Sequence, residues 1–209
     1  ARLVPIADNN VRYNIEKLRG FIVANEISHI YLPTQLCSEF IENEYELDGV
    51  KVLTGGDILV TAKHSKLDIY NNYGPTENTV VTTAHKCDPE TLGVVSIGRP
   101  IPNTQVVILG ANNHLVPEGV YGELCIGGES LMRSYFENPE ANAAQLIQNP
   151  FDPTGETKLY KSGDIVRWGK NGNIEFKGRS DDQIKIRGFR VELGEVEKML
   201  DLQKSVKKS

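Results

Sequence analysis

The chain has 209 residues, of which 39% are hydrophobic and 24% charged, as is ordinary for a globular protein. Its formal net charge of −5 argues against sequence-independent nucleic-acid binding, which depends on clustered Lys and Arg. No run approaches the ~20 apolar residues of a membrane span, and the first residues show no signal-peptide pattern. The scattered cysteines, Cys37, Cys87 and Cys125, lack metal-ligand spacing, so we expect reduced thiols in a cytoplasmic protein.

The first 93 residues alternate between helical and strand patterns. The expected elements are helices at 11–23 and 35–41 and strands at 28–32, 50–53 and 67–70. Such alternation predicts a parallel sheet with helices on its faces. Ligands of such sheets bind beyond the carboxyl ends of the strands. The turns at 54–57 and 71–76 both follow strands, so they could share one site.

From residue 94 the pattern changes to short strands separated by strong turns, with one helix at 139–146. The expected strands lie at 105–109, 122–126, 158–160, 165–168 and 173–176, and then at 183–186 before a helix at 193–200. We therefore predict an α/β protein with three regions. Residues 1–93 form part of an α/β core, 94–178 form a β-barrel-like subdomain, and 179–209 form a hinge and the start of a small α+β subdomain.

The stretch Asn71-Asn72-Tyr73-Gly74-Pro75-Thr76-Glu77 is the most informative. Gly74 and Pro75 predict a tight turn whose backbone N–H groups, with the Thr76 hydroxyl, can hold an anion. Glu77 beside a phosphate requires a bridging cation, usually Mg²⁺, and Tyr73 offers a face on which a base can stack. The alternative is a surface turn with an incidental Tyr and Glu.

Two later stretches carry further signals. In Tyr160-Lys161-Ser162-Gly163-Asp164 a carboxylate follows a strand and could accept hydrogen bonds from a ribose diol, although an Asp that caps a turn is common. In residues 178–197, Ile alternates with charged residues at 184–187. This pattern is typical of an edge strand whose Lys and Arg side chains prevent pairing with a further strand. That interpretation does not explain the flanking Gly178-Arg179 and Gly188.

Together these stretches and their order resemble the adenylate-forming superfamily, and within it the adenylation domains of nonribosomal peptide synthetases. The matching segments are Leu53–Asp57, Asn72–Glu77, Gly98–Pro100, Gly122–Gly128 followed by Arg133-Ser134-Tyr135, Tyr160–Asp164 and Gly178–Glu197. The resemblance covers essentially the whole chain. It implies ATP-dependent activation of an amino acid.

By that resemblance the nucleotide site consists of Gly55, Gly56, Asn71, Asn72, Tyr73, Gly74, Thr76, Asp164, Phe176 and Arg179. Tyr73 would stack on adenine, Thr76 would touch the α-phosphate and Glu77 would bind Mg²⁺. Asp164 and Arg179 would hold the ribose.

The resemblance also assigns to catalysis Thr76, Glu77 and a hinge at Asp181, where a small subdomain would rotate between two half-reactions. Some residues depart from the family pattern. Ser130 and Ser134 stand where the family usually has glycine. Phe176 stands where many members have Tyr, which removes one possible hydrogen bond to the ribose.

The family's phosphate loop, its substrate-binding aspartate and its C-terminal lysine have no counterpart in the sequence. Lys204, Lys207 and Lys208 lie too close to the hinge to be that lysine. Both ends read as interrupted elements, so we expect a fragment that is inactive alone, because this chemistry needs several groups acting together. Such a fragment should expose apolar surface and associate.

The amino-acid pocket of the family maps onto Tyr31, Leu53, Gly55, Asn72, Val80 and Val81. None is charged, so a buried charged substrate side chain would lack a partner. The pattern favours a branched aliphatic substrate and resembles leucine-activating domains. Alternatively, Val80 and Val81 belong to the core of a sheet.

The resemblance implies that leucyl adenylate forms from leucine and Mg·ATP and passes to the phosphopantetheine thiol of a carrier domain. Implied partners are neighbouring condensation and peptidyl-carrier domains, with no nucleic acid and no membrane. One alternative is an acyl- or aryl-acid:CoA ligase, which the run at 185–195 disfavours. Another is a non-catalytic nucleotide-binding module.

Overall fold

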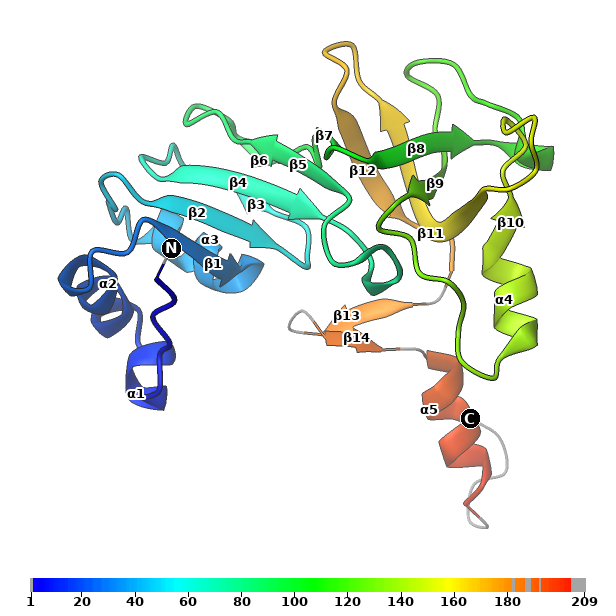
Figure 1. Ribbon diagram of the computed structural model, residues 1–209. Coiled ribbons are helices and arrows are strands. Elements are labelled where there is room, and N and C mark those ends of the chain that lie inside the picture. Colours follow the sequence, from blue (N-terminus) through cyan, green and yellow to red (C-terminus); the bar gives the residue numbers. More distant parts are fainter. Residues whose placement is uncertain (1, 182, 187–188, 192, 204–209) are drawn as a thin grey trace. The chain divides into compact units, whose positions relative to one another are not determined.

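The computed structural model describes residues 2–181, 183–186, 189–191 and 193–203 (Figure 1). The chain divides into two compact units, Ala1–Pro102 and Asn103–Ser209. The boundaries predicted after residues 93 and 178 stay predictions, and Lys204, Lys207 and Lys208 lie outside the described residues. Among those described, no helix has the length and apolar character of a membrane span.

The first unit contains a five-stranded mixed sheet. In spatial order its strands are β1 (His29–Pro33), β2 (Lys51–Gly55), β4 (Asp68–Tyr73), β5 (Thr83–Lys86) and β7 (Arg99–Pro100). β1, β2 and β4 are parallel, as predicted, whereas β5 and β7 add antiparallel. The connection from β4 to β5 is too short for a parallel crossover, which needs a dozen residues or more. A separate ribbon pairs β3 (Val60–Thr61) with β6 (Gly93–Val94).

The helices of this unit are α1 (Asn9–Arg12), α2 (Ile15–Ala24) and α3 (Thr34–Glu42). The single helix predicted over 11–23 is wrong, because the chain starts a new helix at Asn14. The Asn14 side chain accepts a hydrogen bond from the Lys17 backbone N–H at 2.9 Å, and its backbone is extended. Asn is among the residues that best cap a helix N-terminus.

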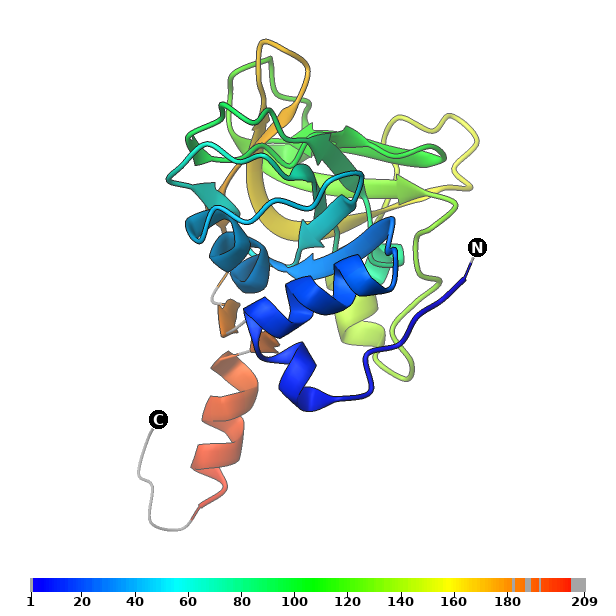
Figure 2. The ribbon, with the colours of Figure 1, turned by 90° about the vertical axis from the view of Figure 1, so that its left-hand side faces the viewer.

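The core of this unit lies between the sheet and helices α2 and α3 (Figures 1 and 2). Leu32, Val52 and Ile69 occupy one face of neighbouring strands and are buried with Ile22 and Phe40 from the helices. Side chains alternate along a strand. The other face therefore carries the residues between these positions, including the predicted pocket residues on β1 and β2.

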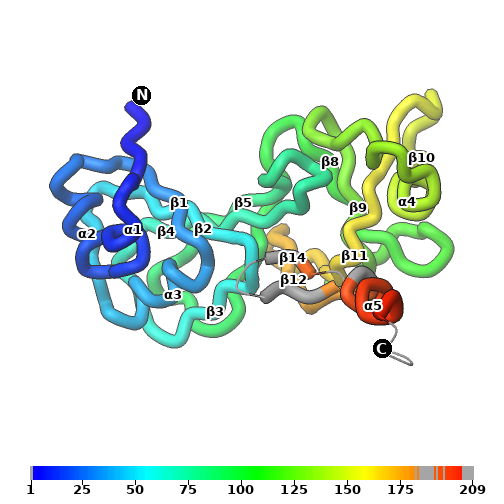
Figure 3. Tube along the Cα trace, turned by 90° about the horizontal axis from the view of Figure 1, so that it is seen from below, coloured from blue at the N-terminus to red at the C-terminus, as the bar shows by residue number. Residues whose placement is uncertain are grey.

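The second unit contains a curled antiparallel sheet (Figure 1). Its strands are β8 (Thr104–Leu109), β9 (Gly122–Gly128), β10 (Leu146–Gln148), β11 (Lys158–Trp168) and β12 (Ile174–Arg179). The spatial order is β10-β11-β9-β8, and β12 also pairs with β11. Helix α4 (Pro139–Gln145) leads directly into β10 (Figure 3). The two strands predicted at 158–160 and 165–168 are one strand, β11, interrupted by a bulge.

The chain continues with a two-stranded ribbon, β13 (Ile184–Ile186) and β14 (Phe189–Val191), and helix α5 (Leu193–Asp201). The sequence predicts β13 and α5 but not β14. The predicted α/β fold class is confirmed. The structure has a mixed α/β layer, a curled β-subdomain and, after them, the ribbon and helix of the last residues.

Candidate functional site

The carboxyl ends of β1, β2 and β4 bring most of the predicted pocket residues onto one face of the sheet. Tyr31 lies opposite Leu53, and Gly55 lies opposite Asn72. Since side chains two positions apart share a face, these residues line the face opposite α2 and α3. The turns after β2 and β4 are therefore neighbours, as the sequence predicts.

Contacts between the strands explain why position 55 is a glycine. A Cβ on Gly55 would lie 2.2 Å from the backbone oxygen of Asn72, so β2 and β4 can approach only without a side chain there. The Tyr31 hydroxyl donates a hydrogen bond to the Gly55 carbonyl at 2.9 Å. Partial burial raises the pKa of Tyr31 above its ordinary value, so the phenol stays a hydrogen-bond donor.

β4 extends further into the motif than predicted. Asn71, Asn72 and Tyr73, which the sequence assigns to a turn, belong to β4 because all three pair with β5, and Asn71 and Asn72 also pair with the end of β2. The turn begins at Gly74 and leads into a 3₁₀ helix, η1 (Thr76–Asn78). Asn71 is buried, and its side-chain amide donates to the Ser96 carbonyl at 3.0 Å, which ties β4 to the segment before β7.

The loop after η1 folds back onto the end of β4. Thr79 and Val80 adopt left-handed backbone conformations, with φ of 50° and 73°. Such a φ is strained for a β-branched residue and costs about 1–3 kcal/mol. The loop is held by the Asn78 amide, which donates to the Thr82 hydroxyl at 2.9 Å, and by the Thr82 N–H, which donates to the Tyr73 carbonyl at 2.7 Å. It places the backbone carbonyl of Val80 beside Gly74, and Val80 itself is 69% exposed.

Glu77 is a suitable but single ligand for a hard cation. Its side chain is 5% exposed and lies in η1 beside the exposed Thr76. No group of three or more His, Cys, Asp or Glu within the described part of the chain could hold a metal ion. Mg²⁺ is commonly bound by one or two carboxylates together with substrate phosphates and water. A cation at Glu77 would thus need the nucleotide for most of its ligands.

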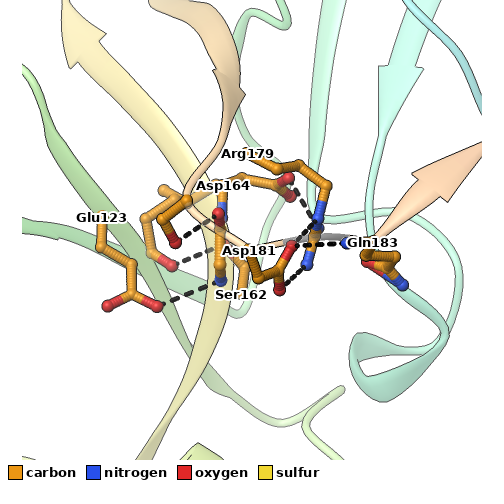
Figure 4. Close-up of polar contacts among 9 residues, drawn as sticks. Glu123, Ser162, Asp164, Arg179, Asp181 and Gln183 are labelled. Carbon is orange, nitrogen blue, oxygen red and sulfur yellow. Dashed lines mark hydrogen bonds and ion pairs between the residues drawn. The ribbon is translucent and has the colours of Figure 1, made fainter. Parts of the chain in front are cut away.

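In the second unit, Arg179 joins two carboxylates (Figure 4). Its Nη1 donates to Asp164 Oδ1 at 2.8 Å, and its Nε and Nη2 donate to the two carboxylate oxygens of Asp181 at 2.6 Å each. Asp164 is 6% exposed and lies opposite Arg179 in the β11–β12 ladder. Burial raises the pKa of Asp181, but hydrogen bonds from Arg179 and its charge outweigh burial, and the net pKa is lowered.

Two polar residues that the sequence did not single out support Asp164. Glu123 on β9 accepts from the Gly163 N–H at 3.1 Å, and the Ser162 hydroxyl accepts from the Asp164 N–H at 3.1 Å (Figure 4). Phe176, from the predicted nucleotide site, is half-buried on β12 opposite Val166. The only sequence signal for the bulge is a glycine between two apparent strands.

The cysteines are not candidates for a nucleophile. All three are free thiols, and Cys37 and Cys125 are buried. Burial raises the pKa of Cys37 and of Cys125 to about 12 and that of Cys87 to about 11. The reactive thiolate is therefore scarce near neutral pH.

Comparison with known proteins gives matches over most of the chain. The model of the family described as AMP-binding enzyme matches residues 1–136. The chain is 45% identical over 195 residues to surfactin synthase subunit 2 of Bacillus subtilis (strain 168), covering 93% of this chain and 5% of that protein. It is 42% identical over 198 residues to bacitracin synthase 1 of Bacillus licheniformis, covering 94% of this chain and 4% of that protein.

Solved structures of nonribosomal peptide synthetases also match most of the chain. A nonribosomal peptide synthetase protein with adenylation and PCP domains, bound to a vinylsulfonamide inhibitor, matches with a TM-score of 0.81 and 28% identity. The match covers 93% of this chain and 36% of that one. A four-domain nonribosomal peptide synthetase bound to AMP and glycine matches with a TM-score of 0.74 and 34% identity, over 95% of this chain and 15% of that one. The chain thus spans a small part of each relative.

Proposed function

This chain belongs to the AMP-binding enzyme family, and from that premise we propose that it is part of a domain that activates an amino acid with ATP. The amino-acid carboxylate attacks the α-phosphorus of ATP, a P–O bond forms, and pyrophosphate leaves. A carrier-domain thiol then attacks the carbonyl carbon of the adenylate, and AMP leaves. The relatives named above include surfactin and bacitracin synthases and two nonribosomal peptide synthetases of known structure, one of which holds AMP and glycine.

The observation that carries the proposal is the Asp164–Arg179 pair. Asp164 is a nearly buried carboxylate held at 2.8 Å by a guanidinium that is itself 17% exposed. Asp164 lies within β11, at the bulge and opposite Arg179 on β12. A carboxylate held in this way can accept hydrogen bonds from the hydroxyls of a ribose, as the acidic residue does in dinucleotide-binding folds. Asp164 and Arg179 are thus proposed to hold the ribose, and Phe176 lies on the same pair of strands.

Nucleotide contacts are also proposed for residues of the first unit. Tyr73 is half-buried at the end of β4 and is proposed to stack on adenine beside Gly55, Gly56 and Asn72. Gly74 and Thr76 would face the α-phosphate. When bound, Mg²⁺ would neutralise phosphate charge, and Glu77 would be its ligand from the protein.

Leucine is the proposed substrate. Tyr31, Leu53, Asn72, Val80 and Val81 carry no charge, so a charged substrate side chain would lack a partner. Gly55 says less about the size of the substrate than the sequence suggests. The close approach of β4 requires a glycine at this position whatever the substrate. The preference therefore rests on the apolar Leu53, Val80 and Val81.

The proposed carrier is a peptidyl-carrier domain with its phosphopantetheine thiol, and a condensation domain is the proposed neighbour. The solved relatives that contain adenylation and PCP domains support the first of these. Asp181 is proposed as the hinge between the two half-reactions. Its lowered pKa keeps it charged beside Arg179 at neutral pH.

Amino-acid-dependent exchange of pyrophosphate into ATP tests the proposal on the full-length protein that contains this sequence. The panel holds leucine, isoleucine, valine, phenylalanine, and several fatty and aryl acids. Highest exchange with leucine is expected. Exchange with another amino acid would keep the class and reject leucine. Exchange with acids that lack an amino group would indicate an acyl- or aryl-acid:CoA ligase, and none at all in folded protein would indicate a non-catalytic module.

A further inference from the structure

We infer that Glu123 is a positioning residue for the nucleotide: it fixes the bulge in β11 that aims the Asp164 carboxylate. The inference rests on the proposed function, in which Asp164 binds the ribose. Glu123 lies on β9, a different strand from both Asp164 and Arg179, and it accepts a hydrogen bond from the backbone N–H of Gly163.

The bulge is visible in the pairing of β11 with β9. Lys161 lies opposite Cys125 and Ile165 lies opposite Glu123, so residues 162–164 face a single residue of β9. Gly163, at its centre, has a left-handed φ of 73°. A bulge interrupts the regular ladder and re-aims the side chains that follow it. Here it turns Asp164 toward Arg179 on β12.

Side chains, together with the backbone N–H of Ser180, make the hydrogen bonds that the interrupted ladder between β11 and β9 cannot provide. Glu123 Oε1 accepts from the Gly163 N–H at 3.1 Å. The Ser162 hydroxyl donates to the Leu124 carbonyl at 2.7 Å and accepts from the Asp164 N–H at 3.1 Å. The Gly163 carbonyl accepts from the Ser180 N–H at 2.8 Å. Glu123 is the one charged group in this set, and its acceptor reaches the centre of the bulge.

The second carboxylate oxygen of Glu123 fixes its orientation. Oε2 lies 3.1 Å from Lys161 Nζ, and the two side chains are 22% and 33% exposed. Because both of its oxygens have a partner, the Glu123 carboxylate can hold the Gly163 peptide more firmly than a carboxylate on a mobile side chain could. Loss of Glu123 would leave that N–H to water and free the peptide to rotate. Because Asp164 follows directly, its carboxylate would lose its alignment with the ribose.

The experiment measures the affinity of the full-length protein for two nucleotides, ATP and 2′,3′-dideoxy-ATP, which lacks both ribose hydroxyls. Wild type, Glu123→Ala, Glu123→Gln, Lys161→Met and Ser162→Thr are compared. Glu175→Ala is the matched control, since it removes a carboxylate and its ion pair with Arg167 from the same sheet. Should Glu123→Ala fail to fold, Glu123→Met replaces it, because it keeps the side-chain length without the acceptor.

Wild type is expected to bind ATP more tightly than the dideoxy nucleotide. In Glu123→Ala the affinity for ATP should fall by about 10-fold, the lower end of the loss seen when residues that orient the ligands of a metal site are removed, with little change for the dideoxy nucleotide. Glu123→Gln and Ser162→Thr, which keep the acceptor at Gly163, should retain most of the ratio of the ATP affinity to the dideoxy-ATP affinity, as should Glu175→Ala. Lys161→Met, which frees the second carboxylate oxygen of Glu123, should lose part of this ratio.

Different results of this experiment reject the proposed ribose site and the positioning role of Glu123. A wild-type protein that does not distinguish the nucleotides overturns the proposed ribose site, and the role of Glu123 with it. If wild type distinguishes the two nucleotides and Glu123→Ala shows the same ratio of ATP affinity to dideoxy-ATP affinity, the positioning role alone is overturned. An equal loss for both nucleotides also overturns it, because it shows a general structural role.

Discussion

Replacement of Gly55 by alanine separates two explanations for a glycine in the predicted pocket. If Gly55 only leaves room for the substrate, an added methyl should narrow the pocket and leave the fold intact. In the structure the new Cβ would lie 2.2 Å from the Asn72 carbonyl oxygen, a distance that real Cβ atoms do not tolerate. The methyl therefore has to push β4 away from β2 at the site itself.

The cost follows from this geometry. Contacts below 3.0 Å force a shift, so the strands must separate locally by about 0.8 Å. Overpacking of this kind costs about 1–3 kcal/mol, and a weakened ladder hydrogen bond adds about 1 kcal/mol. We expect Gly55→Ala to lower the free energy of unfolding by about 2–4 kcal/mol. For a domain of this size the melting temperature should drop by roughly 5–15 °C.

The assay is calorimetric melting of the domain, with exchange measured for each amino acid on the same samples. Gly20→Ala is the control: a Cβ there meets nothing within 4 Å and the position lies inside α2, so it should stabilise. The expected gain is about 0.5–1 kcal/mol. A Gly55→Ala protein that melts like wild type and merely prefers smaller amino acids would refute the reasoning.

Three further predictions follow from single residues. Gly163→Ala adds a Cβ 2.6 and 2.7 Å from the ion-paired groups of Asp181 and Arg179, so the KM for ATP in exchange assays should rise about tenfold or more. Hydrogen bonds, first from Thr154, lower the pKa of Asp152; the stability it contributes is present above its unfolded pKa of about 3.9 and is lost as pH falls. Asp152→Asn should therefore reduce the melting temperature slightly at pH 7, because solvent screens the carboxylate, and by still less at pH 3. Cys37 and Cys125, whose burial raises each pKa to about 12, should resist alkylation at pH 8 in peptide mass mapping until the protein is unfolded.

Sequence patterns predicted the parts of the fold that depend on local periodicity. Strands β1 and β2 and helices α3, α4 and α5 lie close to their predicted ranges, and β4 begins one residue after its predicted start. The neighbouring positions of the turns after β2 and β4 also followed from the sequence. Parallel strands end at the same edge of a sheet, so two such turns must meet there once the strands are adjacent.

Features that depend on contacts distant in sequence were not predictable in this way. β5 and β7 were missed because they are short, and their pairing is set by the sheet that they join. The sequence predicts two strands, at 158–160 and 165–168, where the structure has the single bulged strand β11. Its continuity depends on Glu123, which lies 40 residues away in sequence from Gly163. The left-handed Thr79 and Val80 run against local preference, since strain of this kind persists only where surrounding contacts enforce it.

Gly55 and Gly163 show why a resemblance can identify a residue without giving its physical reason. Each lies in a motif of the predicted nucleotide site, and at each the absence of a side chain is required by neighbouring protein atoms. At Gly55 the neighbour is the backbone of β4, and at Gly163 it is the Arg179–Asp181 ion pair. A substitution at either position disturbs the support of the site before it reaches a ligand. Loss of activity in such variants therefore says nothing about substrate contact unless folding and the discrimination between ligands are measured together.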